Sequence, residues 1–235
     1  MRIFCNGCSW TWGAELKDPE KSRYSTLLGQ MLGAEVTNIS KTGTSLHRLL
    51  RSTYERCDPT KYDIAVLQFT FPARAEYYVP GMSGNRQGSF MRTLPYVTSA
   101  TNMDHVRKDL NNWQEHLNYQ KSYYKTAYSV EMSQTFEFMV FQALQDHFAR
   151  YNIPLVTMTL NNESVLPFDL RINTSDIPRA KDQHPNELGH KIIANKIESV
   201  IKLGKGYPDA KKVHLSRLKR DHEKILKPTD YTDYN

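Results

Sequence analysis

Short apolar runs alternate with segments of helical spacing over most of the chain, and this alternation limits the possible folds more than any other feature. The runs expected to form buried strands cover residues 3–5, 34–39, 64–67 and 153–160. Between them, apolar residues recur every three or four positions and predict helices over residues 24–32, 46–54, 138–148 and 188–200. Strands that alternate with helices favour a mainly parallel sheet covered on both faces. The sequence therefore predicts an α/β fold with three layers, α/β/α.

The alternation stops between Phe71 and about Tyr128. Residues 80–89 are rich in glycine and polar side chains and predict a loop, and the stretch after them is rich in tyrosine and tryptophan. The sequence leaves three interpretations of this middle insertion open, namely a flap over a site, a structural insertion and an oligomer contact.

Two short motifs near opposite ends of the chain carry candidate chemistry. Residues 7–13 read Gly-Cys-Ser-Trp-Thr-Trp-Gly directly after the first predicted strand, and residues 182–185 read Asp-Gln-His-Pro. A glycine on each side of Ser9 permits a sharp turn that presents its hydroxyl at the mouth of the sheet. A serine becomes a nucleophile when an imidazole accepts its proton and a carboxylate orients that imidazole. Ser9, His184 and Asp182 match these three roles.

These residues resemble the SGNH/GDSL hydrolase superfamily. Gly7-Cys8-Ser9 resembles its first block, with cysteine where aspartate is usual, Gly43 resembles its second-block glycine, and residues 182–185 resemble its last block. The resemblance covers residues 1–203 and implies a mainly parallel, flavodoxin-like sheet of the SGNH-hydrolase type.

Two positions depart from the pattern of that superfamily. The third block usually carries a Gly-x-Asn-Asp motif whose asparagine helps to bind the oxyanion, whereas residues 66–71 read Val-Leu-Gln-Phe-Thr-Phe. Thr70 or Gln68 would have to substitute for that asparagine. The common spacing of the last block would place Lys181 in the carboxylate position, and a known Asp-x-His-Pro variant places Asp182 there instead.

The resemblance implies hydrolysis of small acyl esters, with O-acetyl groups on carbohydrates as a natural substrate class. His184, oriented by Asp182, would deprotonate Ser9, and the backbone amides of Ser9 and Gly43, helped by Thr70, would hold the oxyanion. No metal or organic cofactor is implied. The chain also resembles uncharacterised SGNH-like proteins of tailed phages and bacteria, which suggests a cell-surface glycan substrate and virion association. The alternative is a binding or structural protein that keeps the fold but has lost efficient chemistry, because the third-block asparagine is missing.

The charge is concentrated at the C-terminus. Residues 202–227 hold nine Lys and Arg side chains against three acidic ones, which accounts for the whole formal net charge of +6. Residues 204–235 are therefore predicted to be a basic tail attached to one domain at 1–203. Such a tail is typically solvated or packed as an amphipathic helix. Contact with an acidic partner protein or an anionic glycan is the sharper alternative, and nucleic-acid association through the tail is a third one. Nucleic acid is not expected, because no nucleic-acid-binding motif accompanies the charge.

Composition and the remaining polar residues add further expectations. No apolar stretch is long enough to span a bilayer and no signal core follows the N-terminus, so a cytoplasmic protein is expected. Cys5 and Cys8 have the spacing of a redox or half-zinc site, but two reduced, partly buried thiols are preferred. The sequence further predicts a helix-surface position for His190 and a weaker site candidate at His47. Arg74 and Glu76 could bind a polar substrate, and an exposed ion pair between them is the preferred interpretation. It does not predict the oligomeric state.

Overall fold

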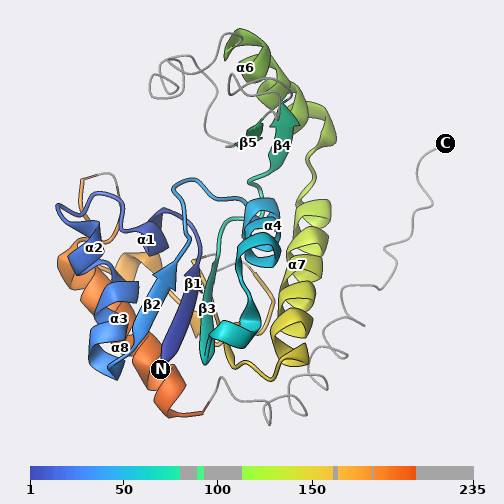
Figure 1. Cartoon of the computed structure of the whole chain (residues 1–235). Helices are drawn as coiled ribbons and strands as arrows, with labels where there is room; N and C mark the ends of the chain where they lie inside the picture. The colour runs from blue at the N-terminus through green and yellow to red at the C-terminus, as the bar shows by residue number, and fades with distance from the viewer. Residues whose placement is uncertain (80–88, 93–112, 161–163, 182, 205–235) are drawn as a thin grey trace.

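A five-stranded parallel sheet forms the centre of the protein (Figure 1). The computed structural model describes residues 1–79, 89–92, 113–160, 164–181 and 183–204. The strands lie in the order β2-β1-β3-β6-β7, and every neighbouring pair in this sheet is parallel. Their bounds are Arg2–Asn6 for β1, Glu35–Asn38 for β2, Ile64–Phe69 for β3, Leu155–Thr159 for β6 and Leu170–Arg171 for β7.

Helices cover both faces of this sheet, so the predicted three-layer α/β/α fold is confirmed. Helices α3 (Tyr24–Leu32) and α8 (Glu187–Lys202) pack together on one face, and α4 (Leu46–Arg56) and α7 (Val130–Arg150) pack on the other. Successive side chains of a strand point to opposite faces. Ile3 accordingly lies in the cluster under α3 and α8, whereas Phe4 lies in the cluster under α4 and α7.

Several element boundaries follow the sequence pattern closely. The predicted helix over residues 24–32 is α3, and its end at Gly33 is confirmed. Strand β3 runs past its predicted end at residue 67 to Phe69, and all its residues are buried. The apolar pattern breaks at Gln68, yet that side chain is fully buried and hydrogen-bonded. A polar residue can occupy a central strand when its amide finds partners inside.

Helix α8 corrects two expectations about which residues lie inside. Leu188, the first residue of the apolar spacing that predicted this helix and so an expected core residue, is 57% exposed. His190, expected at the surface, has no exposed area. The buried face of α8 runs through His190, Ile193 and Ile197, so Leu188 lies off that face. The His190 ring is accommodated because its Nδ1 accepts a hydrogen bond of 3.1 Å from the backbone N–H of Tyr24.

Elements of the middle insertion lie beyond the carboxyl ends of the strands (Figure 1). A small antiparallel pair, β4 (Glu76–Val79) and β5 (Ser89–Arg92), is followed by α6 (Trp113–Ser122) and a π-helix at Tyr123–Ala127. The Tyr124 hydroxyl donates a 2.8 Å hydrogen bond to the carbonyl of Ala73. This bond ties the insertion to the segment that leaves β3. Most of the predicted loop at 80–89 and nearly all of the basic tail lie outside the described residues.

The remaining described elements are short. They are α1 (Ser9–Trp12), α2 (Pro19–Ser22) and two 3-10 turns at Pro59–Lys61 and Thr174–Asp176. Among the helices that the structure describes, none has the length and apolar character needed to cross a bilayer.

Candidate active site

The turn after β1 presents Ser9 as the first residue of α1, and Ser9 is 8% exposed. The chain passes very close to its neighbours just before this serine. A Cβ atom at Gly7 would lie 2.8 Å from the Cβ of Gln68 and would also meet the Thr11 side chain. Distances of this kind do not occur between real side chains, so close approach requires glycine at position 7.

A buried chain of hydrogen bonds supports the turn from below. The Gln68 amide donates to Cys8 Sγ at 2.9 Å, and its oxygen accepts from the Thr11 hydroxyl at 2.5 Å. Thr11 Oγ1 also lies 2.7 Å from the Tyr24 hydroxyl. Gln68 therefore holds the residues on either side of Ser9. Gln68 has no exposed area and gives one of its two amide N–H groups to Cys8, which argues against the alternative that Gln68 binds an oxyanion.

The cysteines are free and buried at all three positions. Burial raises the pKa of Cys5 to about 12, so its thiol stays protonated at neutral pH. The expectation of reduced thiols is met, although Cys5 and Cys8 are more fully buried than expected. Among the described residues, no group of three or more His, Cys, Asp or Glu side chains is placed to hold a metal ion.

The loop after β2 lies against the Ser9 turn. The backbone N–H of Lys41 donates to the carbonyl of Gly7 at 3.3 Å, and the Asn38 amide donates to the carbonyl of Thr11 at 2.9 Å. Gly43 lies in the same loop with φ at +65°, a conformation that favours glycine. The loop that carries the predicted second oxyanion donor is thus attached to both ends of the nucleophile turn.

Thr70 directly follows β3 and is buried. Its hydroxyl accepts a 2.9 Å hydrogen bond from Arg74, whose guanidinium lies 5.1 Å from the ring centre of Phe71. A hydroxyl that accepts one bond can still donate another, so this contact leaves Thr70 able to serve a developing oxyanion. The predicted pair between Arg74 and Glu76 is wrong, because Glu76 instead binds Arg51 at 3.1 Å.

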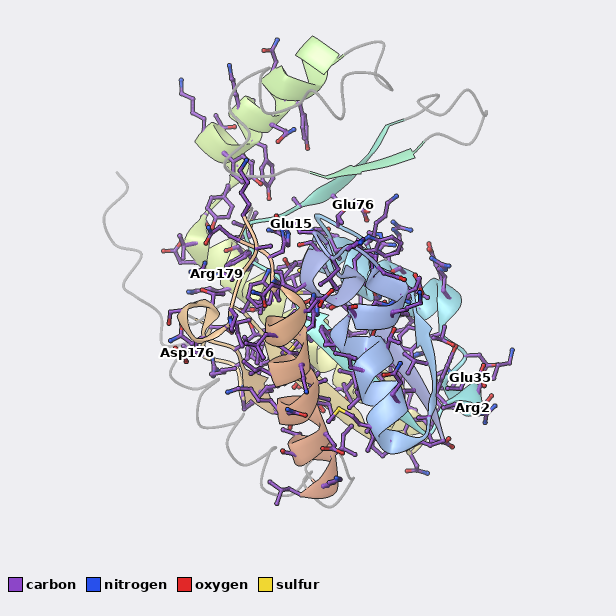
Figure 2. The ribbon with its side chains drawn as sticks, turned by 90° about the vertical axis from the view of Figure 1, so that its left-hand side faces the viewer. Arg2, Glu15, Glu35, Glu76, Asp176 and Arg179 are labelled. Atoms are coloured by element: carbon purple, nitrogen blue, oxygen red, sulfur yellow. The ribbon has the colours of Figure 1, made fainter. Side chains whose placement is uncertain are left out.

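His184 is held by a carboxylate that the sequence analysis missed. Its ring Nδ1 lies 3.0 Å from Oε2 of Glu15, and its backbone N–H donates to the same oxygen at 3.1 Å. Glu15 lies just beyond α1, in the segment that follows the nucleophile, and Figure 2 shows it at the end of the main body nearest the insertion. Asp182, the predicted carboxylate, lies outside the described residues. No motif marks Glu15, and the available signal was its position in the chain a few residues after Ser9.

The loop that carries His184 is fixed to the start of α8. The backbone N–H of Ala180 donates to the carbonyl of His184 at 2.8 Å, and that of Asn186 donates to the carbonyl of Pro178 at 3.0 Å. The Asn186 side chain then caps α8 by accepting from the Gly189 N–H at 3.0 Å. These bonds place the imidazole just before the capped start of α8.

The structure ties His184 to the segment that follows Ser9, but it does not join the two side chains by a hydrogen bond within the described residues. Among the described residues, the Ser9 hydroxyl donates to Cys8 Sγ at 3.9 Å. Catalytic hydrogen bonds are often long before substrate binds.

His47, the weaker candidate, stacks on Phe136 with ring centres 4.1 Å apart, and burial lowers its pKa. Packing accounts for that histidine.

The protein is thus an α/β protein with a five-stranded parallel sheet. Ser9, His184 and the Glu15 carboxylate lie in segments beyond the carboxyl ends of its strands, which form the rim of the sheet. No protein-family model and no curated protein sequence matches the chain.

Solved esterase structures are similar over most of the chain. An esterase, EstA, from Pseudoalteromonas sp. is 14% identical, with 86% of this chain and 96% of that chain covered and a TM-score of 0.47. The acetyl xylan esterase AlAXEase is 14% identical, with 86% and 100% covered and a TM-score of 0.46. The acetylxylan esterase Axe2 from Geobacillus stearothermophilus, in a catalytic mutant, is 11% identical, with 85% and 93% covered and a TM-score of 0.44.

Proposed function

We propose that this protein is a serine esterase in which Ser9 is the nucleophile and His184 is the general base. The observation that carries the proposal is the attachment of the His184 imidazole, through a carboxylate at Nδ1, to the segment directly after the Ser9 helix. An imidazole with Nδ1 bound to a carboxylate has Nε2 available to accept a proton. The backbone amides of Ser9 and Gly43 and the hydroxyl of Thr70 form the oxyanion site.

The reaction has two stages. In the first, Ser9 Oγ forms a bond to the ester carbonyl carbon while its proton passes to His184 Nε2. The tetrahedral intermediate then collapses, the C–O bond to the alcohol breaks, and His184 returns the proton to the leaving alkoxide. In the second stage water attacks the acyl-serine, gives a proton to His184, and releases the carboxylic acid as Ser9 Oγ takes that proton back.

The substrate class of the proposal is small acyl esters, including O-acetyl groups of carbohydrates. A second candidate is a binding protein with weak or absent chemistry. The specific observation in its favour is that the third-block position offers Gln68, whose amide is already bound to Cys8 and Thr11, in place of a free asparagine. An acidic partner of the basic tail belongs to this second candidate.

The proposal is tested by hydrolysis of p-nitrophenyl acetate and labelling with a fluorophosphonate probe, in wild type and Ser9→Ala. We expect both signals in wild type and neither in the variant, while circular dichroism and melting temperature stay unchanged. Acetate release from acetylated xylo-oligosaccharides then tests the carbohydrate substrates. Undiminished hydrolysis by folded Ser9→Ala would refute the assignment, and absence of both signals in folded wild type favours the binding protein.

A further inference from the structure

We infer that Glu15, rather than Asp182, is the positioning residue that holds the His184 imidazole in its reactive tautomer. The inference rests on the proposed function, because it concerns how the general base of that reaction is oriented. It concerns a glutamate that reaches the histidine from the segment after the nucleophile, not from the histidine's own loop.

The contact geometry fixes both the ring and its protonation. One carboxylate oxygen of Glu15 receives the backbone N–H of His184 at 3.1 Å and lies 3.0 Å from Nδ1. The two contacts lock the side chain relative to its own backbone. An ionised carboxylate accepts hydrogen bonds and donates none, so Nδ1 must carry the hydrogen of the neutral ring. Nε2 is then left as an acceptor, which is what a base for the Ser9 proton requires.

Partial burial strengthens this contact. The side chains of His184 and Glu15 are 26% and 19% exposed, so much of the water that would compete for the carboxylate is excluded. Electrostatic attraction increases as the surroundings become less polar. This hydrogen bond from a neutral ring to a carboxylate is therefore better placed than a fully exposed one to hold one ring orientation.

Backbone strain occurs on both segments that this contact joins. Glu15 has φ at +67° and Gln183, next to His184, has φ at +70°. Residues other than glycine, asparagine and aspartate seldom adopt such angles, and strained residues of this kind cluster at functional sites. Gly13 ends α1 with its backbone N–H bound to the Ser9 carbonyl at 3.0 Å, so a single helical turn separates the nucleophile from the segment that carries Glu15. Glycine would suit the backbone at position 15 better, but it has no carboxylate. A glutamate at this strained position therefore points to a use for its carboxylate.

The experiment compares Glu15→Gln with Asp182→Asn, and Glu35→Gln is the matched control. Glu35 is exposed at the start of β2 and lies far from Glu15 in Figure 2. Nitrogen NMR of histidine-labelled protein, at a pH where the ring is neutral, reports which ring nitrogen carries the hydrogen. A His184→Gln spectrum assigns the signal among the eight histidines. Esterase kcat and KM are measured on the same variants.

We expect wild type, Asp182→Asn and Glu35→Gln to hold the Nδ1–H tautomer. Glu15→Gln should lose it, because an amide N–H can donate to Nδ1 and favour the wrong tautomer. The kcat of Glu15→Gln should fall by about 10⁴-fold with KM little changed, as the same carboxylate-to-amide change does in a serine-protease triad. Glu15→Asp, which keeps a carboxylate and suits positive φ better, should recover part of the rate.

A purely structural role for Glu15 predicts a different pattern. The tautomer would then survive in Glu15→Gln and be lost in Asp182→Asn, and this result would overturn the inference. If Glu15→Gln fails to fold, Glu15→Gly removes the carboxylate while accepting φ at +67° without strain, and its tautomer decides in the same way. The tautomer needs no turnover, so a wild type without esterase activity would refute the proposed function and still leave this inference decided by NMR.

Discussion

Single buried residues can make the stability of this fold depend on pH. Glu137 on α7 is buried, with one carboxylate oxygen bound by the Ser164 hydroxyl at 2.9 Å. Its other oxygen has no hydrogen-bond partner within the described part of the chain. Burial raises the pKa of Glu137 to about 7, although the Ser164 bond and the Arg171 charge act in the opposite direction. Between the ordinary pKa of 4.5 and the folded pKa of about 7, this carboxyl group is protonated in the folded chain and ionised in the unfolded chain.

The pH dependence of stability follows from that difference. The folded pKa of Glu137 is about 7 and its ordinary pKa is 4.5, so its contribution is fully present below pH 4.5 and is lost as pH rises to about 7. The total loss is about 3 kcal/mol. Glu137→Gln should remove this pH-dependent loss, so the free energy of unfolding of the variant relative to wild type should be higher at pH 8 than at pH 5. Urea unfolding of both proteins at the two pH values checks this, and equal differences at both would contradict it.

Close packing at Gly7 gives a second residue-scale prediction. Gly7→Ala places a methyl group 2.8 Å from Gln68 Cβ and should cost about 1–3 kcal/mol of folding stability. Because the displaced Gln68 and Thr11 flank the Ser9 turn, esterase activity should fall too. Gly33→Ala is the matched control, since its φ of +58° is strained but no atom lies within 4 Å of its Cβ. Melting temperature and activity of both variants are compared, and an active Gly7→Ala enzyme would count against a rigid turn.

At the scale of elements, α3 and α8 are joined by a buried polar contact within an apolar interface. His190 Nδ1 accepts from the Tyr24 backbone, and its Nε2 has no hydrogen-bond partner among the described residues. Burial, and secondarily the charge of His184, lower the pKa of His190 to about 4. The ring therefore stays neutral in the folded protein through the mildly acidic range.

This contact predicts acid sensitivity of the α3–α8 pair. The folded pKa of His190 is about 4 against an ordinary 6.5, so its contribution is present above pH 6.5 and is lost as pH falls to about 4. His190→Gln keeps an acceptor for the Tyr24 N–H but does not titrate. We expect the variant to lose less stability than wild type between pH 7 and pH 4, by about 3 kcal/mol. Urea unfolding at both pH values gives this difference directly, and parallel curves would refute it.

The elements also explain what the sequence could predict. Helix and strand positions were predictable because apolar spacing reflects burial on one helix face or on both faces of a central strand, as in α3 and β3. The inward position of His190 was not predictable, because a polar side chain is stable in the core only where a hydrogen-bond partner, here the backbone N–H of Tyr24, lies beside it. Glu15 was missed for the same reason, since its partner lies 169 positions away in the sequence. Contacts between distant segments leave no local pattern.

For the whole molecule, the core and rim contacts described above are all made by residues before position 205. Both apolar clusters end by Ile201, and every site residue proposed above precedes α8. Nearly all of the basic tail lies outside the described residues, so its part in folding and activity is tested by removing it. We therefore expect the net positive charge, which is concentrated in the tail, to be separable from the proposed esterase activity.

Deleting residues 205–235 tests that separation. We expect the shortened protein to unfold with the same urea midpoint and to hydrolyse p-nitrophenyl acetate at the wild-type rate, because its core, the Ser9 turn and the His184 loop are retained. Binding of an acidic protein or polyanion, followed at rising salt, should weaken strongly for the full chain and be absent from the shortened one. A shortened protein that loses activity on this small ester would instead place the tail in the site. Because a freely solvated tail cannot move the urea midpoint, a large fall in that midpoint would show that residues 205–235 pack on the core.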